Sequence, residues 1–106
     1  MMNEIRFIRG DTQVFSLNIT DGDGLPYELQ TTDKLVLTVK RSIYNTDTVL
    51  QKTIDASMLI KFEHEDTKSI SFGEYVYDVQ LTQGDIVTTV IPPTPFILEG
   101  EVNYDK

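Results

Sequence analysis

Residues 72–81, with the sequence FGEYVYDVQL, decide the fold that we expect for this chain. Apolar side chains recur at every second position from Tyr75 to Leu81, and alternate side chains of an extended strand lie on one face. This spacing predicts a strand with one buried face. The preceding residues 64–70 include an Asp and a Thr suited to starting one helical turn, and Gly73 permits a sharp entry into the strand. We therefore expect a helical turn that leads directly into a core strand.

An acidic turn followed by a glycine and the pattern Tyr-x-Tyr resembles the corner that leads into strand F of immunoglobulin-like sandwiches. In that corner a tyrosine hydroxyl hydrogen-bonds to the backbone upstream, and the side chain two residues later points into the core. The resemblance implies that Tyr75 forms the corner and that Tyr77 lies in the core. Because the chain has no cysteine, it must rely on packing instead of an inter-sheet disulfide.

Length and composition predict a single domain that spans residues 1–106. The chain is 40% hydrophobic and 25% charged, which is typical of a folded globular protein, and it contains no apolar run of about 18 residues to span a bilayer. Residues 1–9 interleave Glu and Arg with isolated apolar residues and lack the apolar block of a secretory signal. We therefore expect the chain to be made and kept in a cytoplasm until it is used.

The charge balance argues against two classes of partner. Nine Lys and Arg stand against seventeen Asp and Glu, which gives a net charge of −8. A negative protein repels phosphate backbones and anionic lipids, so neither nucleic acid nor a membrane is an expected partner. The acids are spread along the chain, as is typical of a solubilising surface. The absence of cysteine excludes disulfides, thiolate metal sites and thiol catalysis.

Short alternating segments predict strands along the whole chain, separated by turn residues. The expected strands are residues 5–8, 12–20, 35–40, 48–54, 58–63, 72–81, 86–90 and 96–102. Residues 21–26, DGDGLP, form the strongest turn signal, and residues 27–32 are expected to cross between sheets. The spacing predicts an all-β fold, namely an immunoglobulin-like Greek-key β-sandwich of seven to eight antiparallel strands, with a small closed barrel as the alternative.

Three prolines interrupt the last part of this pattern. Pro92, Pro93 and Pro95 can donate no ladder hydrogen bond, so we expect a kink or bulge between residues 86–90 and 96–102. Strands broken by proline usually lie at the edge of a sheet, and we expect the same here.

Three short motifs match known patterns, and each has a plainer interpretation. Residues 9–11, RGD, spell a tripeptide that adhesion receptors read, but Gly-Asp is ordinary turn chemistry. Residues 18–20, NIT, match an N-glycosylation acceptor, but without a secretion signal we interpret them as part of a strand. Asp21 and Asp23 alternate with glycines as in a calcium loop, but the twelfth position is Thr32 rather than an acid. The sequence therefore predicts no metal site.

The ionisable residues form no recognisable catalytic set. His64 is the only histidine, lies among Glu63, Glu65 and Asp66, and has no Ser or Cys nucleophile at a recognisable spacing, so we interpret it as part of a solvated charge cluster. Asp78 lies on the strand face opposite the core, where it either bonds a neighbouring strand or faces water. Nothing selects a carboxylate pair for glycoside hydrolysis. We assign no catalytic, cofactor-binding or metal-binding residue.

Exposed tyrosines are the best candidates for a binding role. Tyr27, Tyr44 and Tyr104 lie outside the expected strands, where a tyrosine ring could stack on a sugar or anchor a protein interface. Single aromatic residues scattered over a surface more often have no binding role.

Residues 8–29, 34–42 and 73–102 carry a further likeness. Its features are Asp11-Thr12 at the start of a strand, Asp23-Gly24-x-Pro26 after it, and Gly73-x-Tyr75-x-Tyr77-Asp78-Val79 before a closing hairpin. Together these stretches resemble a family of small structural proteins and N-terminal domains of tailed bacteriophages, including the domain that begins baseplate upper proteins. The likeness covers nearly the whole chain.

The resemblance implies a virion component, made in the host bacterial cytoplasm, that docks onto other tail or baseplate proteins. It further implies a non-enzymatic immunoglobulin-like module that works through strand edges and faces and forms a homo-oligomer. The chain ends at Lys106 with no following helix, and residues 92–95 replace a tighter turn, so we expect a free-standing structural protein rather than an adaptor. The alternatives are a module that binds host wall sugars through Tyr27 or Tyr44 and a hydrolase that uses two carboxylates.

Overall fold

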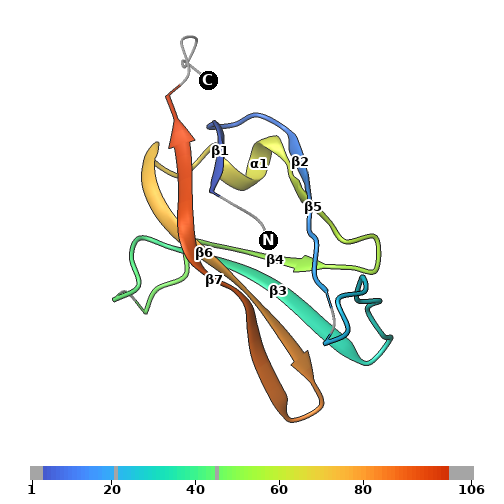
Figure 1. The fold of residues 1–106 in the computed structure, drawn as a ribbon. Helices are drawn as coiled ribbons and strands as arrows, with labels where there is room; N and C mark the ends of the chain where they lie inside the picture. Colours follow the sequence, from blue (N-terminus) through green and yellow to red (C-terminus); the bar gives the residue numbers. More distant parts are fainter. Residues whose placement is uncertain (1–3, 21, 45, 101–106) are drawn as a thin grey trace.

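The computed structural model describes residues 4–20, 22–44 and 46–100, which form seven β-strands and one helical turn (Figure 1). The elements are β1 (Ile5–Ile8), β2 (Gln13–Ser16), β3 (Asp33–Lys40), β4 (Leu50–Ile54), β5 (Leu59–Phe62), α1 (His64–Thr67), β6 (Gly73–Gln83) and β7 (Ile86–Glu99). The predicted all-β class is confirmed. The predicted helical turn is the only helix within the described ranges.

Five of the strands form one sheet in the order β1-β7-β6-β3-β4. The ladders β7-β6, β6-β3 and β3-β4 are antiparallel, but β1 runs parallel to β7, with Ile5 opposite Phe96 and Ile8 opposite Glu99. The prediction of antiparallel strands throughout is wrong at this ladder. Because β1 and β7 come from opposite ends of the chain, no short hairpin connection dictates their relative direction. No ladder between described strands joins β4 to β1, so this sheet is open rather than a closed barrel.

The remaining two strands, β2 and β5, form a separate antiparallel sheet. The regular part of β2 is shorter than the predicted strand at residues 12–20, although the Leu17 N–H still donates to the Met58 carbonyl at 2.8 Å. Met58 has a φ of 60°, a left-handed conformation that ends the turn, so β5 begins at Leu59. Residues 27–32 form no strand and lead into β3.

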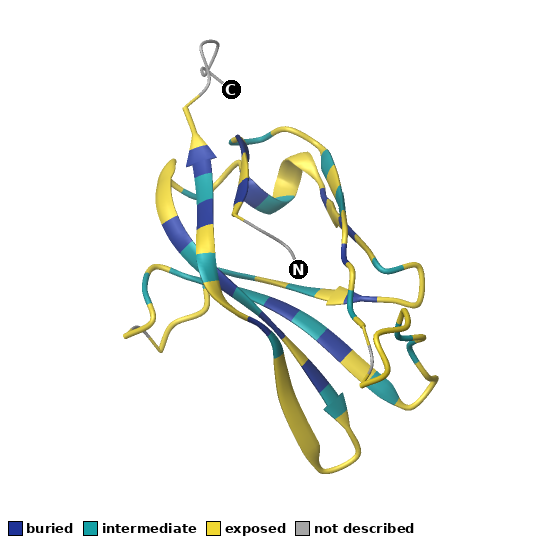
Figure 2. Cartoon of the chain, in the orientation of Figure 1, coloured by how far each residue is buried: buried dark blue, intermediate teal, exposed yellow. Residues whose placement is uncertain are grey.

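Both sheets contribute side chains to one hydrophobic core. Figure 2 shows buried residues alternating with more exposed ones along β3 and β6, which confirms the two-residue repeat read from the sequence. At one end of the core, four aromatic rings pack with centroid separations of 5.3 to 6.0 Å. They belong to Phe7, Phe15, Phe62 and Phe96. Each such pair adds about 0.5–1.5 kcal/mol beyond area burial, so this aromatic cluster ties β1 and β7 to the smaller sheet.

The tyrosine corner is present as predicted. The Tyr75 hydroxyl donates to the Ser71 carbonyl at 2.6 Å, which fastens the start of β6 to the chain just before it. Tyr77 is buried, as expected, and this burial raises the pKa of its hydroxyl to about 12. The corner and the core position therefore both lie where the immunoglobulin-like likeness placed them.

The helical turn α1 begins after Glu63 rather than at its Asp or Thr. The carboxylate of Asp66 accepts hydrogen bonds from the Glu63 N–H at 2.7 Å and from the Lys52 ammonium at 2.8 Å. Thr67 is buried, and its hydroxyl accepts the Gly10 N–H at 2.8 Å. Asp66 thus stabilises the start of the turn, because its side chain reaches back to the N-cap, and Thr67 stabilises the packing of the turn against the first loop.

The proline-containing segment belongs to one continuous strand. The separate strands predicted at residues 86–90 and 96–102 are instead joined in β7, with Val79 opposite Ile91 and Tyr77 opposite Thr94. Register shifts occur on both sides of Val79, which confirms the predicted bulge. The predicted edge position is wrong for residues 96–98, which β1 and β6 flank on both sides. The parallel β1 ladder, which sequence spacing could not reveal, accounts for the difference.

Candidate functional site

The hairpin of β6 and β7 extends beyond the rest of the molecule at its turn end, where it forms the lowest part of Figure 1. Its tip is covered on neither face: Ile86 is 64% exposed and Val87 is 58% exposed. Since β1 pairs only with residues 96–99, no described strand pairs with the outer side of β7 over residues 86–91. We call residues 86–91 the free edge of β7. Unpaired N–H and C=O groups on such an edge can bind another extended chain.

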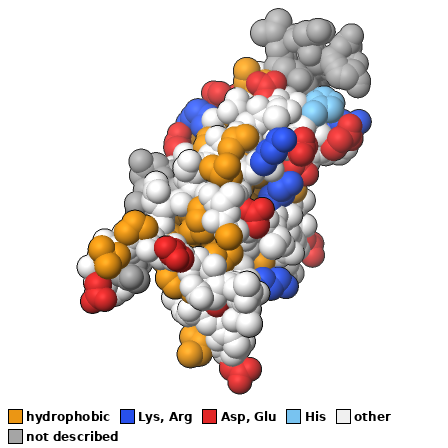
Figure 3. Space-filling view, turned by 90° about the vertical axis from the view of Figure 1, so that its right-hand side faces the viewer, with side chains coloured by type: hydrophobic (Ala, Val, Ile, Leu, Met, Phe, Trp, Pro, Cys, Tyr) orange, Lys and Arg blue, Asp and Glu red, His pale blue; other side chains and the backbone are white. Residues whose placement is uncertain are grey.

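The turn end of the hairpin is seen in the side view of Figure 3. Acidic and basic groups are spread over the visible face, and the lowest tip shows a hydrophobic side chain next to an acidic one. This tip is the β6–β7 turn, where Asp85 precedes Ile86 and Val87. The free edge is therefore an uncharged, largely apolar strip on an acidic protein.

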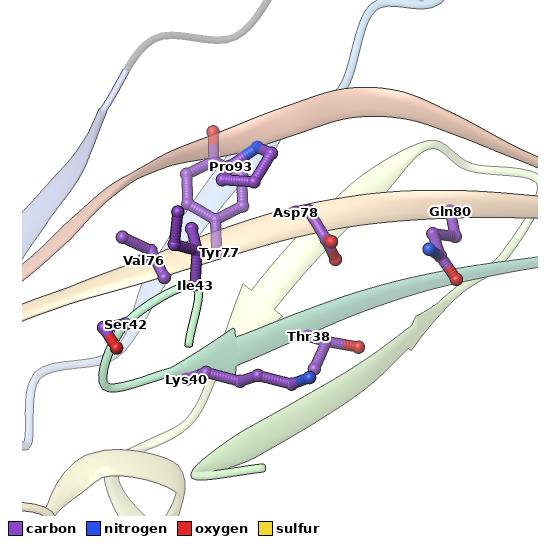
Figure 4. Close-up of a pocket in the computed structure, with 9 residues that line it drawn as sticks. All are labelled: Thr38, Lys40, Ser42, Ile43, Val76, Tyr77, Asp78, Gln80 and Pro93. Atoms are coloured by element: carbon purple, nitrogen blue, oxygen red, sulfur yellow. The ribbon is translucent and has the colours of Figure 1, made fainter. Parts of the chain in front are cut away.

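A groove of about 180 Å³ lies on the outer face of the five-stranded sheet, over β3, β6 and β7 (Figure 4). Its lining residues are Thr38, Lys40, Ser42, Ile43, Val76, Tyr77, Asp78, Gln80 and Pro93. Figure 4 shows the Asp78 carboxylate pointing from β6 toward β3. Burial raises the pKa of Asp78, and the positive charge of Lys40 offsets part of that rise. The Asp78 side chain thus points toward the neighbouring strand β3 and stays partly exposed to solvent.

The groove can bind a small polar group but supplies only half of a glycosidase site. Asp78 is the one acid among its lining residues, and glycoside hydrolysis by the usual route uses two carboxyl groups. What the groove offers is one carboxylate, one ammonium group and several neutral donors and acceptors.

The RGD tripeptide lies in a tight turn that packs against α1. The Asp11 N–H donates to the Ile8 carbonyl at 3.0 Å, and Gly10 has a φ of 87°. The Arg9 guanidinium donates to the Ile70 carbonyl at 3.4 Å and lies 5.8 Å from the centroid of the Phe72 ring. The side chain of Arg9 is therefore engaged within the fold, as the turn interpretation of this motif expects.

His64 also contacts this turn, through the backbone of Gly10. Its Nδ1 lies 2.7 Å from the Gly10 carbonyl oxygen, so that nitrogen carries the proton. Next to it the Gly10 N–H donates to Thr67. The single histidine thus has a structural contact that joins α1 to the first loop, in addition to the exposed position expected from its acidic neighbours.

The three tyrosines proposed for binding have different surroundings. Tyr27 is half-buried, and its hydroxyl donates to Asp33 and accepts from Gln83 at 2.9 Å, so the expectation of an exposed ring is wrong for this residue. The hydrogen bond to Asp33 raises the pKa of Tyr27. Tyr44 is 89% exposed, as expected, and follows Ile43 at the rim of the groove. Tyr104 lies outside the described residues.

The calcium-like motif is only partly described, because Asp21 lies outside the described residues. Within residues 4–20, 22–44 and 46–100, no group of three His, Asp or Glu side chains could hold a metal ion. In the same ranges no helix is long and apolar enough to cross a membrane. Asn18 of the glycosylation pattern follows β2, at the edge of a surface hollow beside Ile19 and Val90.

Sequence reasoning expected open strand edges without locating one. The signal that could have located it is residues 86–91, IVTTVI, in which every residue is β-branched and none is charged. A scan against models of protein families, a search of curated proteins and a search of solved structures each found no match to this chain.

Proposed function

We propose that this chain is a non-enzymatic structural module of a tailed-bacteriophage virion, which acts through protein–protein contacts and self-association. The observation that carries the proposal is the free edge of β7, an uncharged strip of unpaired backbone on an otherwise acidic surface. The resemblance of residues 8–29, 34–42 and 73–102 to small phage structural proteins supplies the class of particle. The expected partners are other tail or baseplate proteins.

We also propose that the fold is an immunoglobulin-like Greek-key sandwich. Such sandwiches place strands C, F and G in one sheet and strands B and E in the other. In chain order, β3, β6 and β7 correspond to the first set, and β2 and β5 to the second. The Tyr75 corner at the start of β6 supports the same assignment. The parallel β1 ladder is the departure from a wholly antiparallel sandwich.

The localisation follows from the proposed role: the chain is made in the bacterial cytoplasm and incorporated into the particle. The test is to purify particles of a phage that carries the gene on a density gradient and to quantify this chain against the major tail protein by mass spectrometry. We expect a fixed copy number per particle that survives a high-salt wash. A chain abundant in infected cells but missing from particles would overturn the proposal.

A second candidate, a module that binds host wall sugars, is favoured by one observation. Tyr44 is 89% exposed and directly follows Ile43, which lines the groove together with Lys40, Asp78 and Gln80. An exposed aromatic ring next in sequence to a polar groove is a feature that sugar binding can use. Binding to wall glycans that disappears in Tyr44→Ala and persists in Tyr27→Phe would favour this candidate.

A further inference from the structure

The free edge of β7 is a short segment with defined ends. At one end the chain turns through Gly84 and Asp85, and at the other Pro92 and Pro93 lack the N–H that a ladder requires. Between them all six residues are β-branched and uncharged, in a chain with a net charge of −8. Native proteins usually protect an exposed edge with charge, proline or a covering element. Here the prolines protect only the part beyond residue 91.

The hairpin geometry shows which backbone groups are unpaired. Gln83 and Ile86 are opposite each other across a two-residue turn, and residues that flank such a turn form a hydrogen-bonded pair. Because hydrogen-bonding direction alternates along a strand, the N–H and C=O of Val87 and Thr89 point away from β6. These are the groups that an added strand would bind.

We propose that two copies of this chain pair antiparallel along the free edge of β7, about a two-fold axis at Thr88. The proposal rests on the proposed function, because it specifies how the module self-associates. A two-fold axis perpendicular to a sheet keeps each face on its own side, so it can only join residues an even number of positions apart. With Thr88 on the axis, Val87 lies opposite Thr89 of the second copy, and the regular pairing ends before Val90, where the bulge of β7 begins.

This register satisfies the unpaired groups identified above. The Val87–Thr89 pair and its symmetry mate are both hydrogen-bonded pairs, each exchanging two bonds, or about four in all. Every cross-strand contact joins two β-branched side chains, which pack well on a pleated surface. The result is one continuous sheet made from the five-stranded sheets of the two copies.

Charge favours a second copy over a charged partner at this edge. The acid nearest to the segment is Asp85, and in this register the two Asp85 residues lie at opposite ends of the interface, about 20 Å apart. That separation exceeds the Debye length of about 8 Å at physiological salt, so the two copies do not repel each other there. The opposite edge of the sheet, β4, carries Lys52 and is less suited to pairing.

The pairing can be tested by cross-linking at the axis, because the chain has no cysteine of its own. In Thr88→Cys the two introduced thiols would face each other across a pair whose Cβ atoms are about 4.5–5.5 Å apart, near the range that a disulfide needs. We expect mild oxidation to give a disulfide-linked dimer in high yield. The matched control is Gln51→Cys, an exposed position on β4 at the other edge of the sheet. Equal cross-linking of the two variants would overturn the proposal.

Sedimentation velocity of the unmodified chain gives an independent measurement. Six residues per copy make a small interface, so we expect a monomer–dimer equilibrium that shifts toward dimer between about 10 µM and about 1 mM. Val87→Pro removes an outward N–H at a position where an edge strand tolerates proline, and should weaken the dimer at least about tenfold. Val87→Thr keeps the N–H and should leave the dimer unchanged. Circular dichroism of each variant confirms that the fold is retained.

The two proposals fail separately. A chain that remains monomeric at every concentration overturns the two-fold pairing, even if it is found at fixed copy number in purified particles. A dimer that cross-links through Thr88→Cys supports the pairing, even if the particles lack the chain.

Discussion

The two ends of the β6–β7 hairpin differ in burial: side chains at one end lie in the hydrophobic core, and side chains at the other end are exposed to solvent. We call the end away from the turn the closed end, because other elements cover it. There Phe96 of β7 is fully buried at 0% exposure, between β1 on one side and β6 on the other. At the turn end, Val87 of the same strand is 58% exposed. The strands continue through both regions, but the second layer of structure covers only the closed end.

Covering elements, rather than strand propensity, decide which part of this hairpin is buried. Residues 86–89 are as rich in β-formers as the residues around Phe96, yet all four are exposed, and burial begins only at Val90 and Ile91. The smaller sheet and β1 both contact the closed end, where the aromatic cluster lies. Side chains at the closed end should therefore contribute most to the stability of the fold, whereas the turn end is free to bind a partner.

Truncating one apolar side chain at each end of the hairpin should give the largest difference in stability. Phe96→Ala removes the ring that contacts Phe7 and Phe62 and should lower the free energy of unfolding by about 3–5 kcal/mol. Val87→Ala, in the exposed turn end, should lower it by less than about 0.5 kcal/mol. Urea denaturation followed by circular dichroism measures both values. Similar losses at the two positions would contradict the unequal ends.

Removing the corner hydroxyl tests the next contribution at the closed end. Tyr75→Phe deletes the hydrogen bond to the Ser71 carbonyl while keeping the ring, and should lower the free energy of unfolding by about 1 kcal/mol. Tyr44→Phe, the same change on an exposed ring, is the matched control and should have no measurable effect. If the two variants unfold at the same denaturant concentration, the corner bond contributes nothing.

The ion pair beside α1 should make stability depend on pH. Burial alone would raise the pKa of Asp66, but hydrogen bonds from Lys52 and from the Glu63 N–H outweigh it and lower that pKa. A carboxylate whose pKa is lowered by folding adds stability above its unfolded pKa of about 4, and this contribution disappears as the pH falls through the folded value. Asp66→Asn should therefore cost at most about 1 kcal/mol at pH 7 and progressively less in acid. A cost that stays constant down to pH 2 would argue against the charge as its cause.

Asp78 in the outer groove should have the smallest effect, with the opposite sign. Burial raises its pKa, so the folded state disfavours the ionised form, and stability falls as the pH rises past the unfolded pKa of about 4. Asp78→Asn should raise the midpoint of thermal unfolding slightly at pH 7 and leave it unchanged below about pH 3. A lower midpoint at pH 7 would indicate that the carboxylate has a stabilising partner in the groove.

The local sequence pattern was sufficient to predict the strands and turns but not the residues that meet in the candidate site. Tyr75, Tyr77 and the strand around them could be placed from spacing alone, because a two-residue repeat and a turn signal are properties of neighbouring residues. The half-buried position of Tyr27 could not, since it depends on Asp33 and on Gln83, which is 56 residues further along the chain. The groove likewise joins residues from β3, β6 and β7, and only the sheet order brings them together.

The amino-acid sequence was enough to predict that this chain is all-β, where most of its strands and turns lie, and which side of β3 and β6 enters the core. These properties follow from backbone preferences and alternating polarity over a few residues. The parallel pairing of β1 with β7 appears only in the folded chain, and because of it β7 is interior at residues 96–98 and has an unpaired edge at residues 86–91. That choice depends on pairing between opposite ends of the chain, where no connecting turn records the direction and every strand offers the same backbone groups.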